Sequence, residues 1–212
     1  MRYIIDHPDR IFEFTQQHLR LVGWSVFIAM LIGIPVGILI TRVRWLEGPA
    51  INTTGVLYTV PSLALFAILI PYTGLGEKTA IIALIMYSLL AIIRNTVSGI
   101  DGVLPATLDA ARGMGMTSQQ RLLMIELPLA LPVILAGIRA ATVSTIGIAT
   151  VAALIGAGGL GRPIFDGMRT LDVDRIVAGA LPASLLALLA DWGIGLLGSA
   201  LRRDLRTASV RG

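Results

Sequence analysis

One polar stretch in the second half of the chain combines an acidic group with small residues at a defined spacing. Asp109-Ala110-Ala111 is followed, after three residues, by Gly115. Nine further residues lead to Ile125, which precedes Glu126 and the pair Leu127-Pro128. An acidic group beside two alanines presents a charge on a low surface, and this shape suits insertion into the cleft of a partner protein. An ordinary helix hairpin is the alternative interpretation.

The first half of this stretch carries signals for a short helix. Pro105 suits the first turn, because its fixed φ is helical and its missing N–H is not needed there. Gly113 or Gly115 can adopt the positive φ that ends such a helix. We therefore predict a helix that begins at Pro105 and ends at one of these glycines.

The second half carries signals for another short helix. Thr117 followed by Gln120 predicts a capping box at the start of a helix over residues 118–125. We expect Leu127-Pro128 to end it, because proline disrupts a helix interior. The whole stretch, residues 105–128, is thus predicted to form two short helices joined at a tight glycine.

The composition excludes several kinds of chemistry. The 212 residues are 55% hydrophobic and 14% charged, with a mean hydropathy of +0.82, whereas soluble domains carry roughly a quarter charged residues. No cysteine occurs, which excludes disulfides, thiol catalysis and zinc–thiolate sites. His7 and His18 are the only imidazoles, and both precede the first apolar segment. We expect no metal site and no histidine-based active site.

The sequence contains patterns that can indicate nucleotide or nucleic-acid binding, but the residues around them do not support either function. Residues 156–161 match GxGxxG, but an apolar segment precedes them and Arg162-Pro163 follows, where a dinucleotide site needs a strand and then a helix. We interpret this run as a bend. The chain has no GxxxxGK[ST] sequence and is not expected to hydrolyse ATP. All but one of its 17 basic residues are arginines, spread near the ends of apolar segments, which indicates membrane topology and not nucleic-acid binding.

The apolar segments predict an all-α integral membrane protein with about five transmembrane helices, because about 20 apolar residues span a bilayer core. Residues 1–17 mix charges with apolar side chains and are predicted to form an amphipathic helix at the membrane surface. Residues 202–212 are predicted to form a basic cytoplasmic tail. The predicted spans are residues 21–40, 51–70, 77–94, 131–155 and 176–201.

The prolines inside these spans include Pro35, Pro61 and Pro182. Membrane helices tolerate proline because neighbouring helices can satisfy the freed carbonyl groups. We therefore expect each of these spans to stay helical across its proline.

Five spans place the two termini on opposite sides of the membrane. Arg42 and Arg44 crowd the first short loop, and the C-terminal tail is also rich in arginine. The same side receives Arg94, Arg112 and Arg121. Because cytoplasmic loops carry an excess of basic residues, we predict that the N-terminus is outside and that the C-terminus and the polar stretch are in the cytoplasm.

Polar side chains inside the predicted spans are candidates either for a passage or for hydrogen bonds between helices. Aromatic faces attract a quaternary ammonium cation by cation–π interaction, so two tyrosines are the first choices for a passage. The candidates are Tyr58, Ser62, Tyr87, Thr142, Ser144 and Thr145.

The spacing of the polar stretch resembles the cytoplasmic EAA loop of ABC-importer permeases, which reads Glu-Ala-Ala, x3, Gly, x9, Ile, x, Leu-Pro. Asp109 stands where that family usually has Glu. The likeness extends over residues 18–201. More narrowly, the chain is similar to the osmoprotectant permeases for glycine betaine, carnitine and choline. Methionine-type permeases share the size and the glycine-rich run. The stretches that support the likeness are residues 60–66, 93–96, 127–139 and 153–161.

This resemblance implies the fold and the partners of a type I ABC importer of the bacterial cytoplasmic membrane. It implies a second permease subunit, identical or related, a pair of cytoplasmic ATPases that bind ATP and Mg, and an extracytoplasmic solute-binding protein. No cofactor is expected in this chain. Residues carried over to the coupling with the ATPase are Asp109, Ala110, Ala111, Arg112, Gly115, Leu127 and Pro128.

Two charges, Arg139 and Asp191, lie near or within the spans. Such charges are candidates for function by default. We favour a structural role, as a pair or as separate interfacial caps, over a proton or substrate site, because an ATP-driven importer needs no proton relay.

Three other functions compete with an osmoprotectant permease. One is a permease for an amino acid such as methionine. A secondary transporter or channel subunit would show broken helices in two repeated halves and more ionisable residues deep in its spans. A membrane-embedded hydrolase would need a Ser/His or His/Glu constellation, and no histidine lies in a predicted span.

Overall fold

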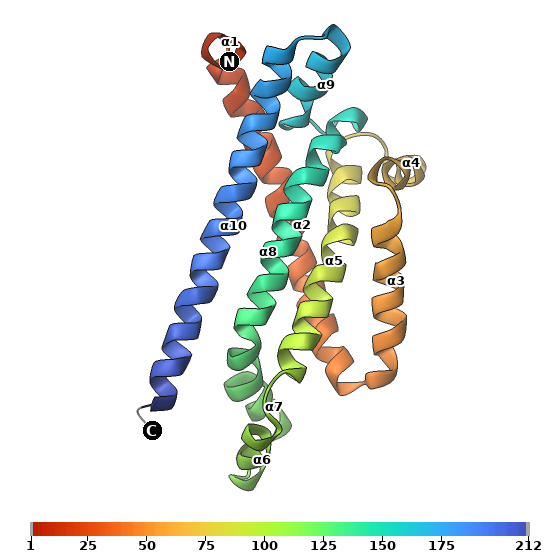
Figure 1. Ribbon diagram of the computed structural model, residues 1–212. Coiled ribbons are helices and arrows are strands. Elements are labelled where there is room, and N and C mark those ends of the chain that lie inside the picture. Colours follow the sequence, from red (N-terminus) through yellow and green to blue (C-terminus); the bar gives the residue numbers. More distant parts are fainter. Residues whose placement is uncertain (1, 211–212) are drawn as a thin grey trace.

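The computed structural model describes residues 2–210, and the side chains of residues 3–200, as an elongated helical bundle (Figure 1). Every element in this part of the chain is helical. Four stretches are long and apolar enough to cross a membrane, and a bent pair of helices could supply a fifth. The predicted all-α membrane fold is therefore confirmed. The four stretches are α2 (Pro8–Arg42), α5 (Glu77–Asp101), the segment Ser118–Ile155 and the part of α10 (Val173–Val210) up to Ala200.

The shorter elements gather at the two ends of this bundle. In Figure 1, α1 and α9 lie at one end, and α6 and α7 lie at the other, toward which the last turns of α10 run. The remaining helices are α1 (Arg2–Asp6), α3 (Glu47–Thr59), α4 (Ser62–Thr73), α6 (Pro105–Gly113), α7 (Ser118–Arg121), α8 (Leu127–Val151) and α9 (Gly161–Thr170). Two 3₁₀ turns cover Arg44–Leu46 and Ala152–Ile155, and a π-turn covers Leu122–Glu126.

The first long helix begins much earlier than the apolar run that predicts it. Residues 8–17 form the first turns of α2 and are not a separate amphipathic helix. Pro8 occupies the start of the helix, where the N–H that proline lacks would have no partner within the helix. Ile11 and Phe14 are buried in a small cluster with Ala178 of α10. The N-terminal residues therefore pack against the end of the bundle.

The second predicted span, residues 51–70, is not one helix. α3 and α4 meet at an angle of 102° around Val60 and Pro61. A proline disfavours the helical conformation of the residue before it, and Val60 is extended, with a ψ of 127°. The 13 residues of α3 rise only about 20 Å, less than the roughly 30 Å bilayer core. The expectation of a helix that continues through Pro61 is wrong.

The two other prolines behave as predicted, because Pro35 lies inside α2 and Pro182 lies inside α10. The third span is longer than predicted, since α5 continues to Asp101 and not only to residue 94. Arg94 therefore lies within a helix and not in a loop. The backbone of residues 202–210 continues α10, whereas the last two residues of the predicted basic tail lie outside the described residues.

The core of the bundle forms where α2, α5 and α8 pack together. Its largest buried side chains include Leu21, Leu84 and Ile92, and Phe66 of α4 closes it from the side. Glycines bring the helices close. A Cβ at Gly137 of α8 would lie 2.5 Å from the Cβ of Asn95 on α5, so no larger residue fits there without moving a helix.

The glycine-rich run at residues 156–161 forms the predicted bend. Gly156, Gly158 and Gly159 have φ values of +82°, +78° and +77°, which favour glycine. The Gly159 N–H donates to Oε1 of Gln17 on α2 at 3.0 Å. The bend is thereby fixed to the first long helix at the end opposite α6.

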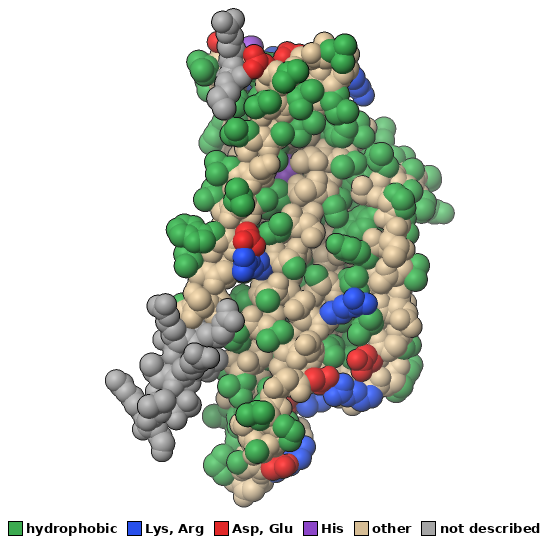
Figure 2. Space-filling model, in the orientation of Figure 1, with side chains coloured by type: hydrophobic (Ala, Val, Ile, Leu, Met, Phe, Trp, Pro, Cys, Tyr) green, Lys and Arg blue, Asp and Glu red, His purple; other side chains and the backbone are tan. Residues whose placement is uncertain are grey.

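Charge is distributed along the bundle as expected for a membrane protein. Figure 2 shows hydrophobic side chains along the length of the molecule, with charged groups mainly toward its two ends. α10 exposes large apolar side chains over most of its length, and these suit contact with lipid or with another membrane helix. Examples are Leu185, Leu188, Leu189, Trp192, Leu196 and Leu197.

Candidate functional site

The polar stretch forms the first short helix as its sequence predicts. α6 begins at Pro105 and ends at Gly113, and Gly115 has a φ of +77°. The N–H of Met116 donates to the carbonyl of Ala111 at 3.1 Å, which closes the turn. Ala111 is buried, whereas Asp109 and Ala110 are exposed.

The second short helix begins as predicted but does not end where expected. Thr117 and Gln120 form a complete capping box at the start of α7. The chain then passes through the π-turn into α8 without a break, because the Leu127 N–H donates to the carbonyl of Leu122, five residues earlier. In a regular α-helix the ring of Pro128 would clash with the carbonyl four residues before it. The wider turn keeps the helix continuous, so the prediction that Leu127-Pro128 ends it is wrong.

Large apolar side chains project from this end of the molecule. Leu104 and Met114 flank α6, and Leu123 and Met124 lie on the π-turn, and all of them are mostly exposed. Exposed apolar groups of this size beside a charged helix are typical of a surface that contacts another protein. None of these residues was among the sequence candidates, although Met114, Leu123 and Met124 lie inside the motif.

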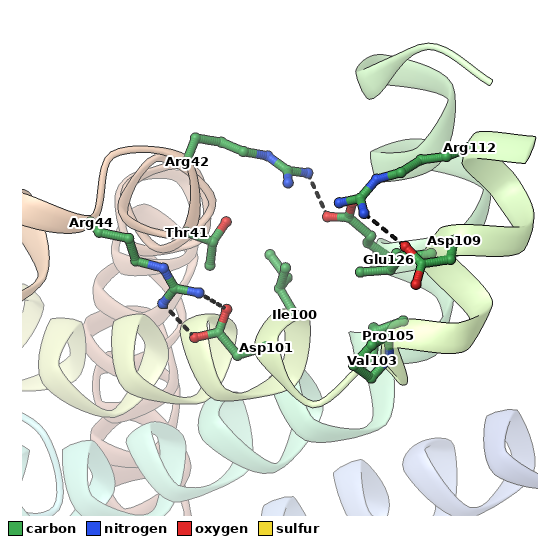
Figure 3. A pocket seen from close by; sticks show the side chains of 11 residues that line it. Thr41, Arg42, Arg44, Ile100, Asp101, Val103, Pro105, Asp109, Arg112 and Glu126 are labelled. Atoms are coloured by element: carbon green, nitrogen blue, oxygen red, sulfur yellow. Dashed lines mark hydrogen bonds and ion pairs between the residues drawn. The ribbon is translucent and has the colours of Figure 1, made fainter. Parts of the chain in front are cut away.

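A cavity of about 320 Å³ separates α6 from the ends of α2 and α5. Figure 3 shows it crossed by paired arginines and carboxylates. Arg44 donates to both carboxylate oxygens of Asp101, at 2.7 and 2.8 Å, which ties the turn after α2 to the end of α5. Within α6, Arg112 donates to Asp109 at 2.8 Å. The carboxylate that the motif presents is thus already paired within its own helix.

A further ion pair at this cavity joins Arg42, in the last turn of α2, to Glu126, at the end of the π-turn. From the sequence, Arg42 and Arg44 are expected only to set the membrane topology, and no role is predicted for Asp101 or Glu126. A carboxylate between Ile125 and Leu127 was the available signal, because a charge among apolar neighbours needs a partner.

The two candidate tyrosines meet beside the break between α3 and α4. Their rings are 6.1 Å apart and nearly perpendicular, at 78°. Tyr87 is buried, and its hydroxyl donates to the carbonyl of Val60 at 2.5 Å. Tyr58 is 45% exposed, and Ser62 is half-buried at the start of α4. Tyr87 therefore supports the break, and Tyr58 and Ser62 reach the surface of the chain.

The three passage candidates on α8 differ from one another in burial and in hydrogen bonding. Thr145 is buried, and its hydroxyl shares a 2.8 Å hydrogen bond with that of Ser88 on α5. The hydroxyl of Thr142 donates to the carbonyl of Ile138 in its own helix at 2.8 Å, and Ser144 is half-buried. Thr145 thus joins two helices inside the chain.

The two intramembrane charges form a pair. Arg139 of α8 donates to both oxygens of Asp191 on α10, and both nitrogen–oxygen distances are 2.5 Å. Their side chains are 44% and 41% exposed in the single chain. The pair links α10 to the bundle.

These features define a multi-pass membrane protein with a short charged helix and exposed apolar side chains at one end. The family of binding-protein-dependent transport system inner membrane components matches residues 29–203. The osmoprotectant import permease protein OsmW of Salmonella typhimurium is 44% identical over 197 residues, which cover 91% of this chain and 92% of that protein. The glycine betaine/carnitine/choline transport system permease protein OpuCD of Bacillus subtilis is 46% identical over 200 residues, covering 94% and 87%.

A solved structure shares the fold. An inward-facing conformation of the MetNI methionine ABC transporter superposes with a TM-score of 0.80 at 21% identity, covering 88% of this chain and 93% of that one. The chain belongs to the family of binding-protein-dependent transport system inner membrane components. It is the permease of an ABC importer.

Proposed function

We propose that this permease carries quaternary-ammonium osmoprotectants, such as glycine betaine, choline and carnitine, across the membrane. The observation that carries this proposal is the identity of 40–46% to permeases whose names specify osmoprotectants, choline or carnitine. The likeness to the methionine transporter is at 21% identity and concerns the fold.

The loop of residues 105–128 is proposed to couple the permease to a cytoplasmic ATPase. Its support is physical, because the exposed Asp109 and Ala110 stand on a short helix that few other side chains touch. Apolar side chains around that helix provide a surface that a protein partner can cover. Arg112 and Gly115 fix the charge and the turn, and Leu127 and Pro128 begin the helix that leaves the loop.

The proposed assembly contains a second permease subunit, two ATPases that bind ATP and Mg, and an extracytoplasmic solute-binding protein. In this assembly the chain needs no cofactor of its own. The proposed orientation puts the N-terminus outside and the C-terminus in the cytoplasm. Its support is that α1 and the loop lie at opposite ends of the bundle (Figure 1), and that Arg42, Arg44, Arg112 and Arg121 lie toward the loop end.

Passage candidates remain part of this proposal in a narrower form. Tyr58 and Ser62 are accessible at the surface of the single chain, so a second subunit can enclose a passage beside them. Tyr87 and Thr145 are buried and hydrogen-bonded inside the chain, whereas Thr142 and Ser144 are half-buried on α8.

The test is uptake by the complete complex, reconstituted in liposomes with its ATPase and its solute-binding protein. We expect ATP-dependent uptake of radiolabelled glycine betaine, choline or carnitine, and ATP hydrolysis stimulated by the loaded binding protein. Uptake of methionine without any of these three solutes would contradict the proposed substrate class.

A further inference from the structure

Glu126 occupies an unusual position for a carboxylate. Its side chain is 3% exposed, and it is the only Asp, Glu, Lys or Arg side chain among the buried residues of the described part of the chain. It is the last residue of the π-turn that connects the loop to α8. π-turns inside α-helices are frequent at functional sites. A buried charge at such a junction needs a partner.

Arg42 supplies that partner from a different span. It belongs to the last turn of α2, 84 residues away in sequence, and its guanidinium donates to Oε2 of Glu126. In Figure 3 its side chain extends from the end of α2 toward the loop, across the rim of the cavity. The pair is therefore a direct link between α2 and the exit of the loop.

The rest of the loop is weakly supported by the spans. The cavity of about 320 Å³ lies between α6 and the ends of α2 and α5, so side chains do not fill that space. α6 is held mainly through its two connections, one from α5 through Val103 and one through α7 and the π-turn. The orientation of α6 thus depends on how the π-turn is anchored.

We propose that the Arg42–Glu126 ion pair is the positioning device that fixes the coupling loop against α2 and passes a displacement of the loop to that span. Arg42 and Glu126 act as positioning residues, because they act on α6 through the π-turn. This inference rests on the proposed function, which makes the loop the coupling element.

Electrostatics explains why an ion pair suits this task. A buried carboxylate loses its hydration, so its pairing with Arg42 resists separation and keeps one geometry. Replacing Glu126 by the isosteric Gln keeps the shape of the side chain and removes the charge. Replacing Arg42 by Gln instead leaves Glu126 buried without its ion-pair partner, which disturbs the π-turn more.

The experiment measures coupling in the complete reconstituted complex, as solute molecules taken up per ATP hydrolysed. The variants are Glu126→Gln, Arg42→Gln and the double variant, with co-purification of the ATPase and the unfolding temperature recorded for each. Arg20→Gln is the matched control. It removes an arginine that pairs with Glu77 at 3.3 Å between α2 and α5 at the opposite end, where the side chains are 67% and 43% exposed.

We expect each single variant to lower the solute-to-ATP ratio about tenfold, and the double variant to be no worse than the more impaired single variant, because the two residues act through one contact. Assembly and the unfolding temperature of Glu126→Gln should stay near wild type. Arg20→Gln should keep the wild-type ratio. Losses that multiply in the double variant would contradict a shared contact.

Two further outcomes overturn the proposal. A ratio within about twofold of wild type in both single variants would show that the pair does not position the loop. Loss of assembly in Glu126→Gln would show that the pair only holds the fold. Gly115→Val, which strains the loop itself, is measured in parallel. If Gly115→Val keeps the wild-type ratio together with the ion-pair variants, the proposed role of the loop fails. If Gly115→Val lowers the ratio and the ion-pair variants do not, only the present inference fails.

Discussion

Arg139 and Asp191 form a two-pronged ion pair between α8 and α10, with both nitrogen–oxygen distances at 2.5 Å. Gly195, one turn further along α10, makes room for it, because a Cβ there would lie 3.2 Å from Nη1 of Arg139. Arg139 is 12 residues after Leu127, or about 18 Å up the helix. The pair therefore fixes the register of α10 well inside the predicted membrane region.

This relationship predicts that the effects of the two substitutions on stability do not add. The double variant should be more stable than a single variant that breaks the pair. Asp191→Asn leaves a guanidinium without its counter-charge in the membrane region, so it should lower the unfolding temperature of the purified complex and the amount recovered. Arg139→Met combined with Asp191→Leu should recover much of that loss, because apolar groups of similar volume can replace an ion pair. An equal or greater loss of stability in the double variant would instead favour a role of the pair in transport. Solute uptake by the complex that still assembles would then test that role.

Helix contacts give a second prediction, which concerns stability only. Gly137→Ala would place a Cβ 2.5 Å from the Cβ of Asn95 and 2.9 Å from the carbonyl oxygen of Ala91, so α5 and α8 must separate. We expect a cost of about 1–3 kcal/mol. Gly147→Ala on the same helix meets nothing within 4 Å and should be neutral or stabilising by up to about 1 kcal/mol. Thermal unfolding of the two variants in detergent provides the measurement, and equal midpoints would refute this packing.

The coupling loop gives a third prediction. Gly115 has a φ of +77° and no neighbour within 4 Å, so a substitution there is disfavoured by backbone conformation and not by space. Gly115→Val should cost about 1–2 kcal/mol locally and misdirect α7, whereas Gly115→Asn should be milder because asparagine tolerates this region. Uptake and solute-stimulated ATP hydrolysis should fall together in the valine variant. Both activities at wild-type level in an assembled complex would remove the support for the loop.

The charge on the same loop can be tested separately. Asp109→Lys places a second cation near Arg112 and reverses the charge offered to the ATPase, so transport should collapse while the protein still inserts. Asp109→Glu keeps the charge and should be tolerated. Membrane insertion, complex assembly and uptake distinguish the two variants, and a functional Asp109→Lys variant would argue against an electrostatic contact.

Local signals explain which parts of the site could be predicted from sequence. Pro105, Gly115 and the Thr117–Gln120 capping box act on residues within one or two turns, and the structure has all three. The Arg42–Glu126 pair joins residues 84 positions apart, so only the packing of α2 against the base of α8 brings them together. No local pattern encodes such a contact.

The prolines show the same limit inside the spans. Pro35 and Pro182 leave their helices intact, whereas Pro61 lies at a 102° bend, although all three follow apolar residues in apolar segments. The difference lies in tertiary contacts, because the hydroxyl of Tyr87 on α5 donates a hydrogen bond to the Val60 carbonyl at the end of α3. Proline alone does not predict the bend.

The hydrogen bond from the Tyr87 hydroxyl to the Val60 carbonyl supports a further prediction. Tyr87→Phe keeps the ring against Tyr58 and removes the donor at the bend, which leaves the Val60 carbonyl short of a partner. We expect a loss of about 1–3 kcal/mol of stability and faster hydrogen exchange in α3 and α4. Unchanged exchange at both helices would show that the bend is held by other contacts, such as the buried side chain of Phe66.

Tyr58 separates a structural role of the aromatic pair from a role in transport. Its ring is 45% exposed and stands edge-on to Tyr87 at 6.1 Å, so one part of it is free to meet a solute. If it attracts a quaternary ammonium group by cation–π interaction, Tyr58→Leu should reduce uptake of glycine betaine and choline several-fold, because such contacts contribute about 0.5–2 kcal/mol. Tyr58→Phe and Tyr58→Trp keep an aromatic face and should retain most of the uptake.

ATP hydrolysis without solute should stay at the wild-type rate in all three variants, since the loop lies at the far end of α5. Equal uptake by the leucine and phenylalanine variants would show that Tyr58 supports the bend without recognising the cation.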